Sequence, residues 1–366
     1  MTAFRTGFRD RARRAGAAAA ARAGALRGRW RGWSRWRKAL VAALALLAVV
    51  IVPIGSAALA LRLQYAGDPS PEARTRGRDA VWLGHAWVDG RKGDADIEEL
   101  ARRLAGTGVR DLYVHTGPLE HDGTLPPAVH PRARWFTAAA HRALPGIRVQ
   151  SWLGDEVKPE KDGLDLEDAA TRERVTASAG QVLDLGFDGV HFDMEPIRPG
   201  SKGWLALLDR VRPVAAGRGA VLSVAVPQID PLPHQHDLGI ALTGHGKWWD
   251  QEYFAATARR VDQVAVMTYD SNMPTESLYG GYNAYQTALA LEATPEDVDL
   301  LMGLPFYWDD RWGHWGRAET VTAGIRGIRL GLGRQDPQRR NFGVGLYVDF
   351  AATEQNWADY RRDWVR

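Results

Sequence analysis

Residues 186–196 read GFDGVHFDMEP, and this stretch is the strongest indication of the fold in the sequence. Side chains alternate along a β-strand, so His191, Asp193 and Glu195 share one face of the segment. The opposite face is apolar and consists of Val190, Phe192 and Met194. Because the apolar face belongs against a layer of helices, the ionisable face must line the mouth of a closed sheet.

Seven further β-rich segments accompany this strand at intervals of about forty residues or less. With it, the predicted strands are 80–87, 109–115, 147–153, 187–195, 220–227, 261–269, 299–306 and 342–350. Amphipathic segments separate them, for example 96–106, where Asp96 and Glu99 read as a capping pair. The alternation predicts an α/β fold, a (β/α)8 TIM barrel over residues 79–366. A doubly wound sheet is the alternative, but neither G-x-G-x-x-G nor G-x-x-x-x-G-K occurs in the sequence.

The N-terminal part differs in character from the rest of the chain. Residues 39–61 form an uncharged run of 23, which as a helix would be roughly 34 Å long against ~30 Å of membrane hydrocarbon. We predict a basic cytoplasmic tail over 1–38, a transmembrane signal-anchor helix over 39–61 and a polar linker over 62–78. The positive-inside rule then places the barrel on the extracytoplasmic side of the cell membrane, with a single pass. A cleaved signal peptide ending at Ala58-Leu59-Ala60 and a buried soluble helix are the alternatives.

Charge and composition limit the kinds of molecule and metal site that the folded domain can hold. The net charge of +3 divides into +11 on residues 1–38 and −8 on the remainder. The mildly acidic remainder argues against a nucleic-acid-binding face on the folded domain. There are no cysteines, which excludes disulfides and thiolate metal sites.

The ionisable face of residues 187–195 indicates catalysis. Three such groups in five residues are costly to bury in an ordinary core, where charges are tolerated only when paired. Crowded carboxylates also raise one another's pKa, so Glu195 can stay protonated near neutral pH and act as a general acid. A charged cluster that merely plugs the barrel is the alternative.

Three motifs resemble those of the family-18 glycoside hydrolases, the chitinase-like barrels. Residues 188–195 match D-G-x-D-x-D-x-E except for His191, residues 267–270 match M-x-Y-D, and residues 303–307 match G-x-P-x-Y. The resemblance covers roughly residues 80–350. It implies that the predicted barrel is glycoside-hydrolase-like.

The resemblance implies a retaining, substrate-assisted hydrolysis of an N-acetylated polysaccharide of the cell-wall or chitin type, with no cofactor. Glu195 corresponds to the acid, and Asp193 to the residue that orients the substrate acetamido group. Tyr269 would hydrogen-bond the acetamido oxygen, and Asp270 would lie near the same subsite. Further candidates for contact with the polysaccharide are His191, Asp188, Met267, Tyr307, Trp308, Trp312 and Tyr347.

Two departures from the family pattern leave other functions open. His191 replaces an inner aspartate, and the eighth strand, residues 345–349, lacks the tryptophan that floors the sugar site in chitinases. A catalytically weak glycan-binding barrel is therefore a second hypothesis. A metal-dependent hydrolase with His85, His115 and His191 near the carboxylates is a third.

Overall fold

The computed structural model describes residues 33–311 and 313–366. Most of the predicted basic tail therefore lies outside the described residues. The chain divides into two compact units, residues 1–60 and residues 61–366.

A long apolar helix, α2 (Arg35–Gln64), dominates the described part of the first unit. Its 30 residues include no buried side chain, and its length and composition are sufficient to cross a membrane. The helix contains the predicted span 39–61 and extends beyond it at both ends. Pro53 lies inside it, a position that membrane helices tolerate better than soluble ones.

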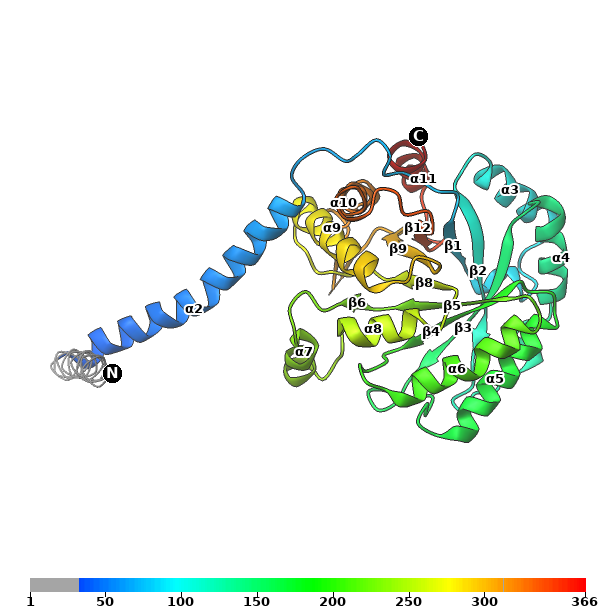
Figure 1. The fold of residues 1–366 in the computed structure, drawn as a ribbon, viewed down its shortest axis with the longest axis horizontal. Coiled ribbons are helices and arrows are strands. Elements are labelled where there is room, and N and C mark those ends of the chain that lie inside the picture. The colour runs from blue at the N-terminus through cyan, green and yellow to red at the C-terminus, as the bar shows by residue number, and fades with distance from the viewer. Residues whose placement is uncertain (1–32, 312) are drawn as a thin grey trace, which may run out of the picture. The chain divides into compact units, whose positions relative to one another are not determined.

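The second unit is a closed barrel of parallel strands, shown in Figure 1. The barrel strands are β1 (Asp79–Leu83), β2 (Val109–Pro118), β3 (Arg148–Glu156), β4 (Gly189–Glu195), β5 (Val221–Val226), β8 (Gln263–Val266), β9 (Asp299–Pro305) and β12 (Phe342–Tyr347). Their order around the barrel is β1-β12-β9-β8-β5-β4-β3-β2. Each corresponds to one predicted strand, so the (β/α)8 TIM barrel is confirmed. The predicted first strand was too long, because the chain turns into a short 3-10 helix (His85–Trp87) after Leu83.

Helices surround the barrel (Figure 1). They are α3 (Asp94–Leu104), α4 (Ala133–Ala143), α5 (Ala169–Leu183), α6 (Lys202–Ala216), α8 (Gln251–Ala258), α9 (Glu276–Ala293), α10 (Val321–Gln335) and α11 (Glu354–Tyr360). The predicted capping pair of α3 was half right. The Asp96 carboxylate accepts from the Gly93 N–H at 2.9 Å, as a capping residue does, but Glu99 pairs with Arg102 on the helix surface.

Short elements decorate the ends of several barrel strands. They are a two-residue pair β6 (Gln228–Ile229) and β7 (Trp248–Trp249), a helix α7 (Gln235–Thr243), and a ribbon of β10 (Asp310–Arg311) and β11 (His314–Trp315). Further short helical turns are Pro127–Val129 and Arg361–Val365.

The alternation predicted for β4 is observed. Val190, Phe192 and Met194 are 0–3% exposed and belong to the apolar layer between strands and helices. His191 is also fully buried, but its contacts lie inside the barrel, with Trp82 of β1 and Ser223 of β5. The strand therefore presents its polar face to the barrel interior.

Residues 61–78, here called the strap, pack against the barrel and do not form a free linker. A Cβ added to Gly281 of α9 would lie 1.9 Å from the Leu61 carbonyl oxygen, so this glycine makes room for the strap. Arginines of α10 bind its carbonyl groups: Arg334 donates to Gln64 and Ala66, Arg326 to Gly67, and Arg329 to Ala73. The polar segment predicted as a linker is thus part of the folded domain.

The strap should contribute measurably to stability. A fragment that starts at residue 79 loses the hydrogen bonds to Arg326, Arg329 and Arg334, each worth ~1 kcal/mol net. We expect its melting temperature to lie about 5 °C or more below that of a fragment starting at residue 61. Thermal unfolding of both fragments, followed by circular dichroism, measures the difference. Equal melting temperatures would show that the strap contacts are not stabilising.

Candidate active site

Strand β4 delivers Asp193 and Glu195 to the mouth of the barrel at the carboxyl ends of the strands, where TIM-barrel enzymes carry their active sites. Glu195 pairs in register with Glu156 at the end of β3. A cavity of about 570 Å³ opens at this point. It is lined by Asp155, Glu156, Lys161, Asp193, Glu195, Pro196 and His245.

Glu195 is exposed to this cavity, yet the protein atoms crowded around its carboxyl group raise its pKa. The largest cause is that these atoms keep water away from the carboxyl group, and the negative charges of Asp193 and Asp270 raise the pKa further. A carboxyl with a raised pKa keeps its proton at neutral pH and is suited to general acid catalysis. Glu195 thus has the electrostatics of an acid.

Asp193 lies deeper than Glu195. Burial raises its pKa, and a hydrogen bond from the Trp152 indole opposes the rise. Its other oxygen, Oδ1, is buried and has no hydrogen-bond partner among the described residues. A buried acceptor without a partner is costly, so this oxygen is available for a donor brought by a ligand.

Two tyrosines, Tyr269 and Tyr347, lie near the two carboxylates, and the ring of Tyr307 contacts the rings of both. The ring of Tyr269 stacks on Tyr347, with centroids 5.2 Å apart, and meets Tyr307 at a right angle, with centroids 6.2 Å apart. Burial raises the pKa of Tyr269, and the charges of Asp193 and Glu195 raise it further. Its hydroxyl is therefore a neutral donor close to both carboxylates. Tyr269 follows the end of β8, which stops at Val266, three residues before the predicted end.

Asp270 is held in a specific orientation by cationic and hydroxyl groups. Its backbone has φ of 52°, a left-handed conformation that aspartate tolerates better than most residues. Tyr307 donates to it at 2.6 Å, and Arg311 and His314 each lie 3.1 Å away. Burial would raise the pKa of Asp270, but these partners outweigh it and lower the pKa. Asp270 is therefore ionised, which helps Glu195 to keep its proton.

Sequence reasoning missed His314 and Glu319, which complete this cluster. His314 is fully buried, with Nδ1 3.1 Å from Asp270 and 3.3 Å from Glu319. Burial alone would lower its pKa, but the two carboxylates raise it to about 9. The imidazolium therefore balances the two carboxylates. The only signal in the sequence was the density of polar and aromatic residues after the seventh strand.

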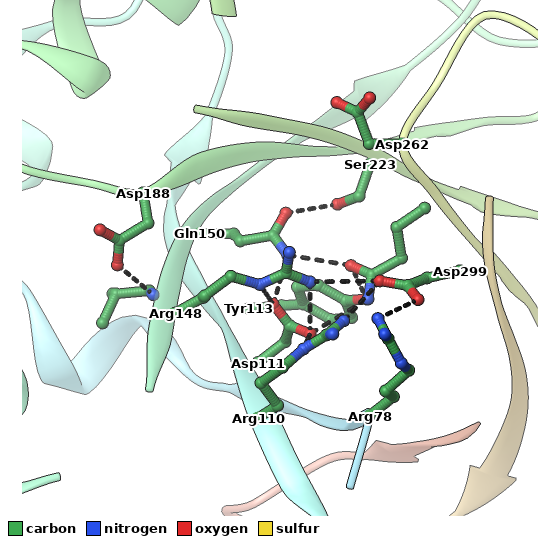
Figure 2. Close-up of polar contacts among 12 residues, drawn as sticks. Arg78, Arg110, Asp111, Tyr113, Arg148, Gln150, Asp188, Ser223, Asp262 and Asp299 are labelled. Carbon is green, nitrogen blue, oxygen red and sulfur yellow. Dashed lines mark hydrogen bonds and ion pairs between the residues drawn. The ribbon is translucent and has the colours of Figure 1, made fainter. Parts of the chain in front are cut away.

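Two predicted substrate contacts are not at the cavity. Asp188 precedes β4 and lies at the opposite end of the barrel, where it accepts from the Val149 N–H at 2.7 Å (Figure 2). It also pairs with His141 at 2.7 Å. His191 is fully buried below the cavity. Neither side chain lines the cavity, because Asp188 is at the amino end of its strand and His191 lies two residues below Asp193.

The remaining predicted contacts differ in their exposure. Trp308 is 64% exposed and follows Tyr307 at the barrel mouth, while Met267 packs against the apolar interior of the barrel. Trp312 lies outside the described residues.

The predicted histidine site for a metal is not formed. His85 Nδ1 lies 3.0 Å from the His115 carbonyl oxygen, and burial lowers the pKa of His115 to about 4. His191 has other partners inside the barrel. Over residues 33–311 and 313–366, the group with spacing suited to a metal ion is instead Asp270, His314 and Glu319, where the imidazolium already balances the charge.

Comparison with solved structures adds independent evidence on the fold. The spore cortex-lytic enzyme SleL of Bacillus cereus superposes with a TM-score of 0.55 at 14% identity, covering 78% of this chain and 74% of that one. SleL of Bacillus megaterium gives 0.56 at 14% identity, covering 81% and 76%. A chitinase of Chromobacterium violaceum gives 0.53 at 14% identity, covering 78% and 98%. The barrel has the fold of these chitinase-type proteins.

Sequence comparison gives no such likeness. No family model matches the chain, and no curated protein matches it by sequence. The likeness therefore rests on the shape of the barrel, and any activity must be argued from the side chains at its mouth.

The raised pKa of Glu195 leads to a pH prediction. A general acid works only in its protonated form, so activity should be lost as pH rises through the folded-state pKa. Because burial, Asp193 and Asp270 raise this pKa, we expect the alkaline limb of kcat/KM well above the ordinary range of a glutamic acid. A pH–rate profile with an N-acetylated oligosaccharide measures it. An alkaline limb near pH ~4–5, the ordinary glutamate range, would exclude Glu195 as the acid.

Proposed function

We propose that this barrel hydrolyses glycosidic bonds in an N-acetylated polysaccharide of the cell-wall or chitin type, with Glu195 as general acid. The observation that carries the proposal is the pairing of a proton-holding Glu195, open to the cavity, with a half-buried Asp193 whose buried Oδ1 has no hydrogen-bond partner among the described residues. An acid alone suits many hydrolases. An acid next to an unpaired buried acceptor suits a substrate that brings an amide N–H.

The proposed first step breaks the glycosidic bond with help from the substrate. The acetamido carbonyl oxygen attacks the anomeric carbon, while the Glu195 proton passes to the departing glycosidic oxygen. Asp193 Oδ1 accepts the acetamido N–H and stabilises the positive oxazolinium. Tyr269, a neutral donor beside both carboxylates, hydrogen-bonds the acetamido oxygen.

The second step restores the enzyme. Water attacks the same carbon from the side that the leaving group vacated, and the Glu195 carboxylate takes its proton. The two inversions give net retention of configuration. Asp270, kept ionised by Tyr307 and Arg311, holds the negative charge that favours the protonated state of Glu195 before each cycle.

The decisive experiment is product analysis. The chain is incubated with N-acetylated oligosaccharides and with peptidoglycan, and the products are identified by mass spectrometry. Release of shorter oligosaccharides with retained anomeric configuration supports the proposal. Tight binding without any cleavage would instead favour the glycan-binding barrel, which the replacement of the inner aspartate by His191 keeps as the second candidate.

We further propose that α2 is retained as a membrane anchor with the barrel on the extracytoplasmic side. The helix is long and apolar enough to span, and the +11 charge of residues 1–38 precedes it. Such a location would place the cavity beside cell-envelope polysaccharide.

Topology is testable on intact cells. With tags at each end of the chain, added protease should remove the C-terminal tag and spare the N-terminal one, because a dense arginine cluster resists translocation. Cells opened by detergent serve as the control, in which both tags are lost. A C-terminal tag protected in intact cells would contradict the proposed orientation.

A further inference from the structure

His191 lies directly under the catalytic carboxylates, inside a cage of aromatic rings. The Tyr113 ring stacks on the imidazole, with centroids 3.7 Å apart and an interplanar angle of 7°. The Trp82 indole meets it edge-on at 5.5 Å. All three side chains are at most 1% exposed, so the imidazole has no access to solvent.

The hydrogen bonds of His191 assign its tautomer. An indole N–H can only donate, so the Trp82 Nε1 at 3.2 Å requires a lone pair on His191 Nε2. A neutral imidazole carries one proton, which must then be on Nδ1. That nitrogen lies 2.8 Å from Ser223 Oγ and donates to it.

The direction of the next bonds agrees with this assignment. Ser223 Oγ donates to Gln150 Oε1 at 2.7 Å, leaving its lone pairs free to accept from His191. The Gln150 amide in turn donates to Asp111 at 2.9 Å and to Gln263 at 2.9 Å. We call this chain of hydrogen bonds, from His191 through Ser223 and Gln150 to Asp111, the relay. Each donor in it points away from His191 and toward the Asp111 carboxylate.

The relay ends in a cluster of charges at the base of the barrel, shown in Figure 2. Arg148 donates to Asp111 at 2.7 Å, and Arg110 bridges Asp111 and Asp299. Arg78 binds Asp299 at 2.8 Å. The negative end of the relay is therefore already neutralised, and it does not draw a second proton onto His191.

A second proton on His191 would also break the arrangement. It would sit on Nε2 and face the Trp82 N–H, donor against donor, and it would place a charge among buried rings. Burial lowers the pKa of His191 to about 3, although the distant Asp111 opposes the shift. No described contact joins His191 to Asp193.

We propose that His191 is a positioning residue that stays uncharged and in the Nδ1–H tautomer, so that Asp193 and Glu195 exchange protons only with each other and with substrate. The resemblance implies a third carboxylate at this position, and the relay replaces it. The groups that face the catalytic pair come from several elements: they are Trp152, Asp155 and Glu156 of β3, Lys161 and His245 of the cavity lining, Tyr269 and Asp270 beyond β8, and Tyr347 of β12. This inference rests on the proposed function for its catalytic consequence alone.

The tautomer can be observed without any activity. The full chain is labelled with ¹⁵N-histidine, purified in detergent, and examined by NMR, with His191→Asn identifying the signal. We expect a protonated Nδ1 and an unprotonated Nε2 whose shifts stay constant while pH is raised from about 5 to about 9. Titration within that range, or a proton on Nε2, would overturn the proposal.

Substitution of Ser223, the residue that accepts the Nδ1 proton, tests whether this hydrogen bond forms. Ser223→Ala deletes the acceptor of the Nδ1 proton, so the Nδ1 signal of His191 should shift, while the Trp82 N–H still keeps the proton off Nε2. Ser178→Ala is the matched control, because Ser178 is also buried and donates to the Gly123 carbonyl outside the barrel interior. Signals of His191 that respond equally to both substitutions, or to neither, would refute the relay.

The pH–rate profile tests the catalytic consequence. His191→Asn is neutral and should leave both limbs within about 0.2 of a pH unit, whatever it does to kcat. His191→Asp places a carboxyl beneath Asp193 and should move the acidic limb by more than about half a unit. A shift in the asparagine variant as large as in the aspartate variant would show that His191 itself ionises. Absence of hydrolysis in the unsubstituted chain would refute the proposed function and leave the NMR result standing.

Discussion

Replacing Glu195 by glutamine is expected to reduce turnover of an N-acetylated oligosaccharide by ~10²–10⁴-fold, the usual contribution of general acid catalysis. Glutamine keeps the shape and the hydrogen bonding of the side chain but has no proton to give. Because it also removes an ionisable group from a crowded site, thermal stability should not fall. Initial rates by chromatography and thermal unfolding measure the two effects.

Glu156→Gln is the matched control for this substitution. Glu156 lies opposite Glu195 on β3 and lines the same cavity, but it pairs with Lys161 at 3.3 Å. Its loss should change turnover only slightly. Near-normal turnover in Glu195→Gln would remove Glu195 from the mechanism, and failure of that variant to fold would favour a charged plug of the barrel.

Removing the acetamido group from the substrate should abolish hydrolysis. An oligosaccharide with a free amine at the cleaved position lacks the internal nucleophile that the proposed mechanism requires, so it should bind without turnover. A thiazoline mimic of the oxazolinium should inhibit, because the site is built to stabilise that charged intermediate. Parallel assays of the acetylated and deacetylated substrates, with and without the thiazoline, measure both effects.

An ordinary two-carboxylate mechanism predicts the reverse. Asp270 would then serve as nucleophile or base, and a neutral glycan without acetamido groups would be cleaved regardless of thiazoline. Asp270→Asn distinguishes the two roles. In the substrate-assisted route it should mainly lower the alkaline limb, because the loss of its negative charge lowers the pKa of Glu195. Complete loss of activity at every pH would favour Asp270 as the nucleophile.

The barrel was predictable because its signal is periodic and repeated. Each strand carries apolar side chains toward the helices, and the turns from each helix to the next strand are short, so errors were confined to strand ends such as Leu83 and Val266. The strap was not predictable. Its polar sequence is typical of a linker, and the arginines that hold it lie some 260 residues away in the chain.

The candidate site was predictable where one strand carries it. Asp193 and Glu195 lie next to each other along β4, and alternation alone places them at the barrel mouth. Depth along the strand was harder to judge, so Asp188 and His191 were assigned to the cavity. His314 and Glu319 were missed because their position depends on a loop whose path no local pattern determines.

The packed strap also limits how far from its membrane anchor the proposed enzyme would reach. A flexible chain as long as the strap would add ~25 Å of root-mean-square reach beyond the anchor. If α2 is the anchor proposed above, binding of the strap to α9 and α10 removes that reach, and a barrel roughly 50 Å across would act only on polymer within about its own width of the lipid. Glycan strands at the inner boundary of the envelope would be trimmed, while those farther out would escape.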